Sequence, residues 1–508
     1  MLGKDLNFKS IYRRITLLGM VCLSVCLLLC ALTSCGEERG QLEQKIQEAV
    51  QDPAMLNEQT FNELVAIITA SPEDYRQFLT ENGRVDLSRL QELVDRIGKR
   101  HNPEFVWNLS EYGGAVNGPL SLRLMLERSG SMDGYDARSG SGDFKRAVGE
   151  MLTRFPGDSK EVFIVNDGVY PYTGSLNSFV QDKDIFSSTK GVGDPSYTDF
   201  AKIFDFALTD TVPERITVLV TDMIYSPRDT RGVSASKIFN EAGTLATTLF
   251  TSHKDKSVIV VKLTGDFHGT YYPYSRPSGV NYSGSRPYYM IVIGSASAMQ
   301  KLRGDSGYAS FADFGSLPGY EADYFFNRNR LPLGYYGVMP RGKGTTGSYE
   351  LAGDGDGAAH ALKEVRGEKG DGLFTLRVAV DLSQVPATDD YLCDKANYEA
   401  DGGLTIEKVE AVTPAMTDAR TKRYLEKATH LITLKGSARN LPERSTVTLK
   451  NRMPSWIAQS TAESDAEPAA PGFSTSTFGL LPFMQGIYSA YYGTASVPDF
   501  INFTISFK

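Results

Sequence analysis

Cysteine is scarce in this 508-residue chain, and its placement is uneven. Four of the five cysteines lie within the first 35 residues, so Cys393 is the remaining thiol. A single thiol cannot form an internal disulfide, and packing must therefore stabilise the folded part of the chain. We expect Cys393 to be a small core or strand residue rather than a nucleophile.

Other absences narrow the classes of function. The chain has no long basic run and a formal net charge of −8, which argues against a nucleic-acid partner. Its five histidines are scattered, and none lies in an H-E-x-x-H pattern. No serine lies in a G-x-S-x-G elbow, and no Walker or G-x-G-x-x-G loop follows an expected strand. We therefore predict a protein without a recognised catalytic constellation.

Residues 1–35 are expected to form an export signal, because a basic start precedes an apolar run over residues 15–32. The sequence Leu-Thr-Ser-Cys-Gly at positions 32–36 resembles the lipobox of bacterial lipoproteins. This resemblance implies that Cys35 is lipidated and anchors the protein to the outer membrane, on its surface or on its periplasmic face. A transmembrane helix is the alternative, since about 20 apolar residues can span a bilayer.

The rest of the chain changes its pattern twice. Residues 36–115 carry apolar residues at helical spacing and are expected to form a helical stalk or module. Residues 116–310 alternate short apolar strands with helical stretches, which indicates an α/β domain with a mostly parallel sheet covered on both faces. Ligands bind at the carboxyl ends of the strands in such sheets.

The C-terminal part is expected to be an all-β domain. Residues 311–370 are rich in Gly and Tyr and are predicted to be a connector. Residues 371–508 contain strands with a period of two, which favours an antiparallel β-sandwich. We expect Trp456 to pack in the core or at the edge of this sandwich, and the polar segment 459–471 to be a mobile loop.

One group of acids and hydroxyls follows the expected strands of the α/β domain. Glu127, Ser129 and Ser131 come directly after the first strand, in an acid-x-Ser-x-Ser spacing. Thr198 precedes an expected helix, and Asp222 ends a later strand. This arrangement resembles the metal-ion-dependent adhesion motif of von Willebrand factor type A domains, which uses Asp-x-Ser-x-Ser, a loop Thr and a strand-end Asp.

The resemblance covers roughly residues 119–310 and implies a Rossmann-like fold with a bound Mg²⁺ or Mn²⁺. Its metal ligands would be Glu127, Ser129, Ser131, Thr198 and Asp222. In the family, a carboxylate of the partner completes the coordination of the ion, and no bond is broken.

Two residues depart from the pattern of the family. Glu127 stands where the family has Asp, and Met223 stands where it often has Gly. Glu127 either holds the ion through a water or pairs with Arg128 and leaves a vestigial site. The serines and Asp222 have an alternative as turn or helix caps.

A second candidate for binding is a tyrosine-rich segment within residues 267–290. Tyr271, Tyr272, Tyr274 and Tyr282 are expected to bind a partner, because tyrosine is enriched at interfaces. A packed β-ribbon is the equally favoured alternative. The sequence thus predicts an envelope adhesion protein that binds a protein or glycan, with a glycan-binding lipoprotein or an envelope assembly factor as the alternatives.

Overall fold

The structure is a computed structural model of the chain. It describes residues 40–508 except residues 52–54, 57, 80–84, 103–104, 106, 108, 110–117, 183–184, 186–188, 226–231, 277, 328–330, 332, 343, 354–358 and 494–496. The export signal and Cys35 lie outside the described residues. The chain divides into two compact units, Met1–Ala115 and Val116–Lys508. Among the described helices, none is both long and apolar enough to cross a membrane.

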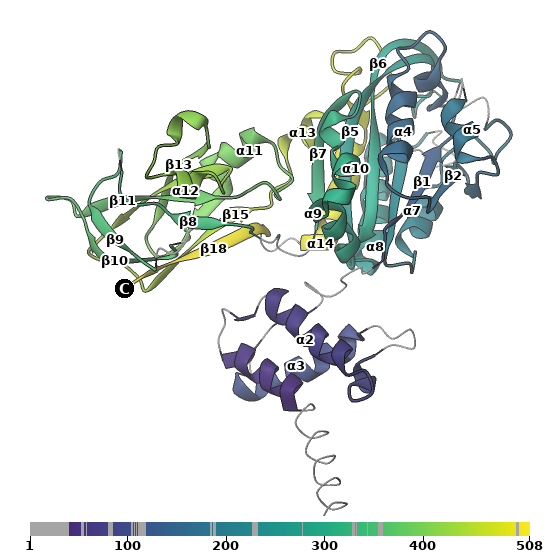
Figure 1. Cartoon of the computed structure of the whole chain (residues 1–508). Coiled ribbons are helices and arrows are strands. Elements are labelled where there is room, and N and C mark those ends of the chain that lie inside the picture. Colours follow the sequence, from purple (N-terminus) through teal and green to yellow (C-terminus); the bar gives the residue numbers. More distant parts are fainter. Residues whose placement is uncertain are drawn as a thin grey trace, which may run out of the picture. The chain divides into compact units, whose positions relative to one another are not determined.

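The first unit is helical (Figure 1). A helix over residues 40–51 is followed by α2 (Glu58–Ala70), the short 3₁₀ turn η2 (Arg76–Phe78) and α3 (Leu87–His101). Asp86 caps α3 by accepting a hydrogen bond from the backbone N–H of Arg89 at 3.2 Å. The apolar stripes of the helices share one core, which includes Ile46, Leu64 and Leu93.

A seven-stranded sheet dominates the second unit, with the order β3-β2-β1-β4-β6-β5-β7. Its strands are β1 (Ser121–Glu127), β2 (Lys160–Val165), β3 (Val169–Pro171), β4 (Arg215–Thr221), β5 (Lys256–Tyr271), β6 (Val280–Ser295) and β7 (Tyr320–Phe326). The second unit therefore has the mixed α/β content that the sequence predicted.

The prediction of a mostly parallel sheet is wrong. Strand β1 pairs in parallel with β2 and β4, but the four other pairings in this sheet are antiparallel. The cause is a long hairpin of β5 and β6, which places β6 beside β4 in the antiparallel direction. Its inner half is buried on both faces, as parallel strands usually are, so the apolar run did not reveal its direction.

Helices cover both faces of this sheet (Figure 1). One face packs against α4 (Asp143–Arg154), α5 (Leu176–Gln181) and α9 (Ala296–Gly304). The opposite face packs against α7 (Phe200–Leu208) and α8 (Ala235–Ser252). Side chains alternate along a strand, and Met125 of β1 lies in the α7 and α8 core. Glu127, two residues further along β1, therefore faces the same side.

Two smaller sheets follow along the chain. One has the order β12-β15-β18-β10-β9 and the other has the order β13-β14-β11-β8. Their pairings are antiparallel except for β10 with β18. Their strands are β8 (Tyr336–Val338), β9 (Ser348–Ala352), β10 (Ala361–Arg366), β11 (Leu373–Val380), β12 (Tyr398–Ala400), β13 (Thr405–Ala411), β14 (His430–Ser437), β15 (Arg444–Lys450) and β18 (Asp499–Phe507).

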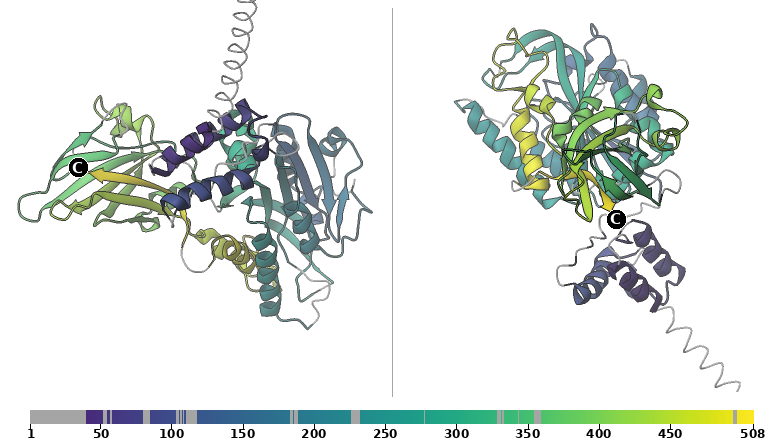
Figure 2. Two further views of the ribbon diagram at one scale, coloured as in Figure 1. Left: turned by 90° about the horizontal axis from the view of Figure 1, so that it is seen from below. Right: turned by 90° about the vertical axis from the view of Figure 1, so that its left-hand side faces the viewer.

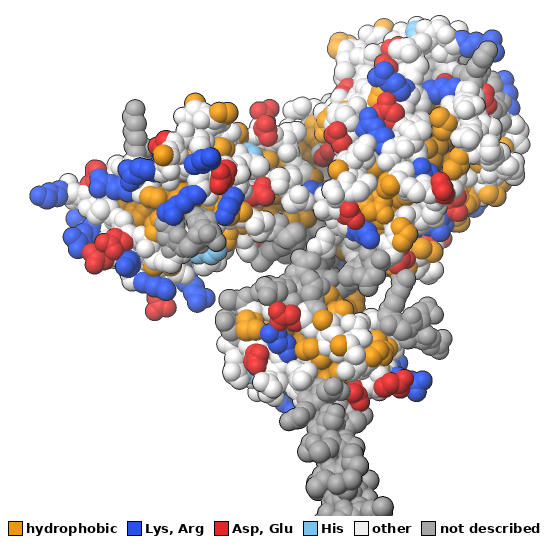
Figure 3. All heavy atoms as spheres, in the orientation of Figure 1, with side chains coloured by type: hydrophobic (Ala, Val, Ile, Leu, Met, Phe, Trp, Pro, Cys, Tyr) orange, Lys and Arg blue, Asp and Glu red, His pale blue; other side chains and the backbone are white. Residues whose placement is uncertain are grey.

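The antiparallel sheets match the alternation of apolar and polar residues. Leu376, Val378 and Ile432 lie in one buried cluster with Val447 and Ile505 of the other sheet. The segment 311–370, expected as a connector, contributes β7 to the large sheet and β8 to β10 to the smaller ones. On the face drawn in Figure 3, basic and acidic side chains are interspersed over this part of the chain.

A segment near the C-terminus packs on the large sheet. It contains α13 (Ser455–Gln459), β16 (Thr461–Ala462), β17 (Thr477–Phe478) and α14 (Leu480–Tyr492). Helix α14 runs beside α8, where Thr247 Oγ1 donates a hydrogen bond to Gly486 O at 3.2 Å (Figures 1 and 2). Trp456 Nε1 donates to Asp323 O of β7 at 3.3 Å, so Trp456 contacts the large sheet.

Candidate metal site at the ends of β1 and β4

Two buried carboxylates lie at the carboxyl ends of β1 and β4. The two strands are parallel neighbours, with Leu126 opposite Val220. Glu127 ends β1 and Asp222 directly follows β4, so the register places them at the same edge of the sheet. Their residues are only 1% and 2% exposed, respectively. Such deep burial of two neighbouring acids is costly unless something compensates their charge.

Three hydroxyl side chains surround these carboxylates. Thr198, in the loop before α7, donates a hydrogen bond from Oγ1 to Glu127 Oε1 at 2.5 Å. Ser129 Oγ and Ser131 Oγ lie 3.0 Å apart, and Ser131 also hydrogen-bonds the Asp222 carboxylate. The five side chains that the sequence singled out are therefore brought together, although three separate segments carry them.

The environment of this site disfavours ionised carboxylates. Burial and, to a smaller extent, the charge of Asp222 together raise the pKa of Glu127 to about 7, although hydrogen bonds from nearby hydroxyls oppose the shift. Burial also raises the pKa of Asp222, against hydrogen bonds from Ser131 and the backbone N–H of Ile224 and the positive charge of Arg286. Within the described chain, Glu127 Oε2 is buried without a hydrogen-bond partner.

The donor set fits a hard divalent cation better than a soft one. It offers two carboxylates and three neutral hydroxyls, and Mg²⁺ prefers oxygen ligands of this kind. Across the residues that the structure describes, no three side chains of the His, Cys, Asp and Glu types form a metal-binding group. Thus any cation held here would depend on the hydroxyls as well as the acids.

Asn166 is a structural residue of this edge that the sequence reasoning missed. It follows β2, and its Nδ2 donates hydrogen bonds to Val192 O at 2.8 Å and Arg128 O at 3.3 Å. The backbone carbonyl of Asn166 accepts a hydrogen bond from the backbone N–H of Asp199 at 2.8 Å. Asn166 thus ties the loop after Glu127 to the loop that contains Thr198. A lone Asn after a strand carries no sequence signal for such a role.

Met223 occupies a backbone conformation that suits glycine. Its φ is +56°, in the left-handed region that costs a residue with a side chain about 1 kcal/mol or more. The side chain compensates by packing in the core beneath the sheet, where the residue is 3% exposed. Met223 therefore adopts this turn conformation and adds volume to the core.

The tyrosine-rich segment forms the tip of the β5–β6 hairpin. Tyr271 is buried and donates a hydrogen bond to Asp465 Oδ2 at 2.9 Å, and the Tyr274 ring stacks on Phe478 with centroids 4.5 Å apart. Tyr282 contacts the Phe473 ring at 4.9 Å. Tyr272 differs from these three, because it is 41% exposed.

These contacts attach segment 463–478 to the hairpin. Arg286 of β6 lies buried between the rings of Tyr271 and Phe473, with its Cζ 4.8 and 4.2 Å from their centroids. It donates hydrogen bonds to the carbonyls of Phe473 and Ser476. The expected mobile loop, residues 459–471, therefore includes a buried attachment at Asp465.

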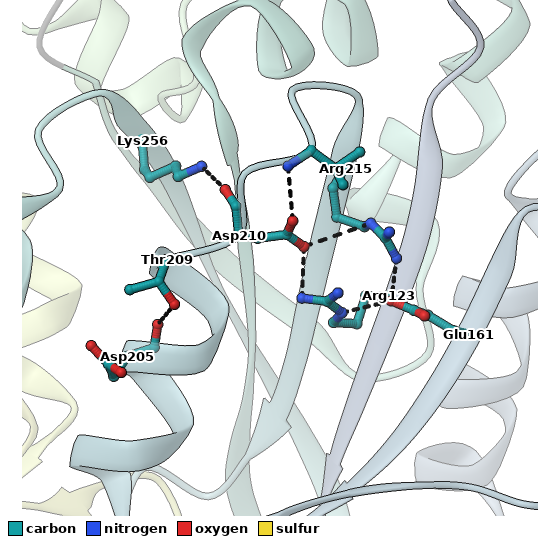
Figure 4. A network of polar contacts seen from close by, with 8 residues as sticks. Arg123, Glu161, Asp205, Thr209, Asp210, Arg215 and Lys256 are labelled. Carbon is teal, nitrogen blue, oxygen red and sulfur yellow. Dashed lines mark hydrogen bonds and ion pairs between the residues drawn. The ribbon is translucent and has the colours of Figure 1, made fainter.

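A second polar cluster lies at the other end of β1 (Figure 4). Arg123 pairs with Glu161 at 2.7 Å and with Asp210 at 2.6 Å. Arg215 pairs with the same two carboxylates. The Arg123 guanidinium also lies over the Phe206 ring of α7, with Cζ 4.7 Å from its centroid. Two cations and two anions balance each other, so this cluster joins strands and carries no unmatched charge.

A serine–histidine contact on the hairpin has the geometry of a cross-strand pair. His268 Nδ1 lies 2.6 Å from Ser283 Oγ, and the two residues face each other in register. Both side chains are on an exposed part of the ribbon. The pair lacks the enclosed surroundings that strengthen electrostatic stabilisation of a transition state.

Comparison with known proteins identified no similar protein. No protein-family model, no curated protein and no solved structure matches the chain.

Proposed function

We propose that this protein is a lipid-anchored binding protein of the cell envelope with a variant von Willebrand factor type A-like domain. It binds its partner at the edge formed by β1 and β4, through a divalent cation that both molecules share. The observation that carries the proposal is the burial of Glu127 and Asp222 side by side among hydroxyls. The lipobox-like sequence at residues 32–36 supports the location at the envelope.

The residues at this edge fit Mg²⁺ or Mn²⁺. The cation would be held by Glu127, Ser129, Ser131, Thr198 and Asp222. Because Glu127 Oε2 has no hydrogen-bond partner, it is available as a metal ligand. A bound cation supplies a positive centre with a coordination position for a carboxylate of the partner. It also relieves the cost of burying two like charges. Hydroxyl ligands are neutral, so they leave much of the charge of the cation for the partner.

The candidate cation site at the carboxyl ends of β1 and β4 is a better candidate for partner binding than the four predicted tyrosines as a group. Three of the four predicted tyrosines use their rings or hydroxyls for contacts within the chain. A glycan-binding protein or an assembly factor with a vestigial metal site would need another surface to recognise its partner. The burial of two acidic side chains next to each other would then have no functional explanation.

Calorimetric titration of Mg²⁺ and Mn²⁺ into the full chain, purified in detergent, tests this proposal. We expect saturable binding that is lost in Asp222→Ala and strongly weakened in Ser129→Ala. Asp390→Ala removes an exposed carboxylate of α11 (Asp389–Cys393) and should bind as the wild type does. Absence of binding in the folded wild-type chain would refute the proposal.

A further inference from the structure

Tyr272 is an exposed aromatic residue beside the candidate cation site at the carboxyl ends of β1 and β4. In the described part of the chain, only Tyr272 and Val212 are large hydrophobic residues classed as exposed, at 41% and 38%. Isolated exposed hydrophobic residues are ordinary, so exposure alone assigns no role to Tyr272. The position of Tyr272 indicates a role, because the other three tyrosines of this hairpin tip make contacts within the chain and Tyr272 remains exposed.

The Tyr272 ring packs on the backbone of the site loop. A Cβ atom built on Gly130 would lie 3.0 Å from Tyr272 Cε2 and 3.5 Å from Cζ. Gly130 separates Ser129 from Ser131, and successive Cα atoms are about 3.8 Å apart. The ring therefore lies against the residue that separates the two serines of the candidate site. Gly130 N also donates a hydrogen bond to Pro195 O at 2.9 Å, which fixes the loop under the ring.

A second glycine fixes the ring from the hairpin side. A Cβ atom on Gly279 would lie 3.1 Å from Tyr272 Cδ1, and the φ of Gly279 is +71°. Both edges of the ring thus pack against glycines while part of the side chain stays open to solvent. The neighbouring Tyr271 is anchored by Asp465, so the backbone that carries Tyr272 is held from the other side as well.

The charges around the site limit the kind of ligand. The site loop carries Asp133, which is exposed, and Asp194 lies next to Pro195 on the facing loop. These two exposed carboxylates make the rim of the site acidic, and they would repel a ligand with several negative charges. A ligand with one carboxylate and an apolar neighbour suits both the acidic edge and the aromatic ring.

We propose that Tyr272 determines specificity at this edge, and that the ligand is a protein segment in which one carboxylate lies beside an aromatic or aliphatic side chain. The carboxylate is taken by the cation site and the apolar side chain packs on the Tyr272 ring. This inference rests on the proposed function, because it assigns the ligand class of the same site. Tyr272 acts by positioning and selection, and it is not itself a ligand of the cation.

Two small carboxylates test the inference directly. Acetate and 3-phenylpropionate are titrated into the Mn²⁺-loaded full chain, and paramagnetic broadening of their proton signals gives the two dissociation constants. An aromatic pair contributes enough to favour 3-phenylpropionate by about three- to tenfold. We expect this preference in the wild type and in Tyr272→Phe, and its loss in Tyr272→Ala. Val212→Ala, at the opposite end of β4, is the matched control and should keep the preference.

The outcomes separate the two proposals. If the wild-type chain binds Mn²⁺ but shows no preference, or if Tyr272→Ala retains the preference, the role of Tyr272 is refuted while the cation site stands. If the wild-type chain does not bind Mn²⁺, both proposals are refuted together. A preference that is lost equally in Val212→Ala and Tyr272→Ala would show a global effect and would also overturn the assignment.

Discussion

The two ends of β1 carry polar clusters of opposite character. At the amino end, Arg123 and Arg215 are matched by Glu161 and Asp210 through direct ion pairs. At the carboxyl end, Glu127 and Asp222 are buried together, and the positive charge of Arg286 only partly offsets the shift of Asp222. The comparison teaches that charge balance distinguishes a structural cluster from one that is poised to bind a cation.

The largest effect is expected from breaking the balanced cluster. Arg123→Met keeps much of the side-chain volume but leaves Asp210 without its closest cation. Loss of one partner of a buried pair costs about 3–5 kcal/mol, and we expect a decrease of this size in the free energy of unfolding. Urea denaturation measures it. Arg366→Met is the control, because its pair with Glu364 is exposed and should change stability by less than about 1 kcal/mol. Equal effects of the two substitutions would contradict the assignment.

The unbalanced cluster predicts a dependence of stability on pH. The pKa of Glu127 is about 7 in the folded chain against a reference value of 4.5, so the native state holds its proton longer than the unfolded state. The metal-free chain should therefore lose stability as pH rises from 4.5 to 7, by an amount on the order of 3 kcal/mol. Unfolding at pH 5 and pH 8 measures this loss, which Glu127→Gln should lack. Parallel pH profiles for the two proteins would contradict the prediction.

Met223, which follows Asp222, offers a test that depends on a smaller difference in stability, about 1 kcal/mol between two variants. Met223→Ala removes core volume and keeps the left-handed backbone strain, whereas Met223→Gly removes the volume and relieves the strain. Both should be less stable than the wild type by about 2–4 kcal/mol, with Gly the more stable of the two by about 1 kcal/mol. Thermal unfolding orders the three proteins. A glycine variant less stable than the alanine variant would show that the left-handed strain is not significant.

Asn166 should affect cation binding more than global stability. Asn166→Ala and Asn166→Asp both remove the amide donor that joins the two site loops, and we expect each to weaken Mn²⁺ binding about tenfold. Asn397→Ala is the matched control, since Asn397 donates its amide to Tyr391 O at 2.9 Å outside the large sheet. It should lower stability and leave Mn²⁺ affinity unchanged. Unaltered affinity in both Asn166 variants would remove Asn166 from the site.

Local patterns in the sequence predicted the strands and the cluster of site residues. The spacing of Glu127, Ser129 and Ser131 after an apolar run identified one strand end, and Asp222 identified another. These residues meet because β1 and β4 are parallel neighbours. Their convergence depends on a pairing that holds here although most of the sheet is antiparallel.

Contacts between residues that are far apart along the chain could not be predicted from the sequence, for physical reasons. A buried apolar run such as residues 289–293 looks the same in a parallel strand as in the inner half of a long hairpin. Asp465 was expected to lie in a mobile polar loop, but its burial depends on Tyr271, which lies 194 residues away along the chain. Asn166 was missed because one amide can join two loops without any repeated or spaced motif.

One measurement tests the central claim that the carboxyl end of β1 carries uncompensated charge for a cation. Thermal unfolding at pH 8 compares the wild type with Asp222→Asn, each with and without Mn²⁺. We predict that, without Mn²⁺, Asp222→Asn is more stable than the wild type. We also predict that Mn²⁺ raises the melting temperature of the wild type but not that of Asp222→Asn. A destabilised Asp222→Asn together with a wild type that does not respond to Mn²⁺ would contradict the account.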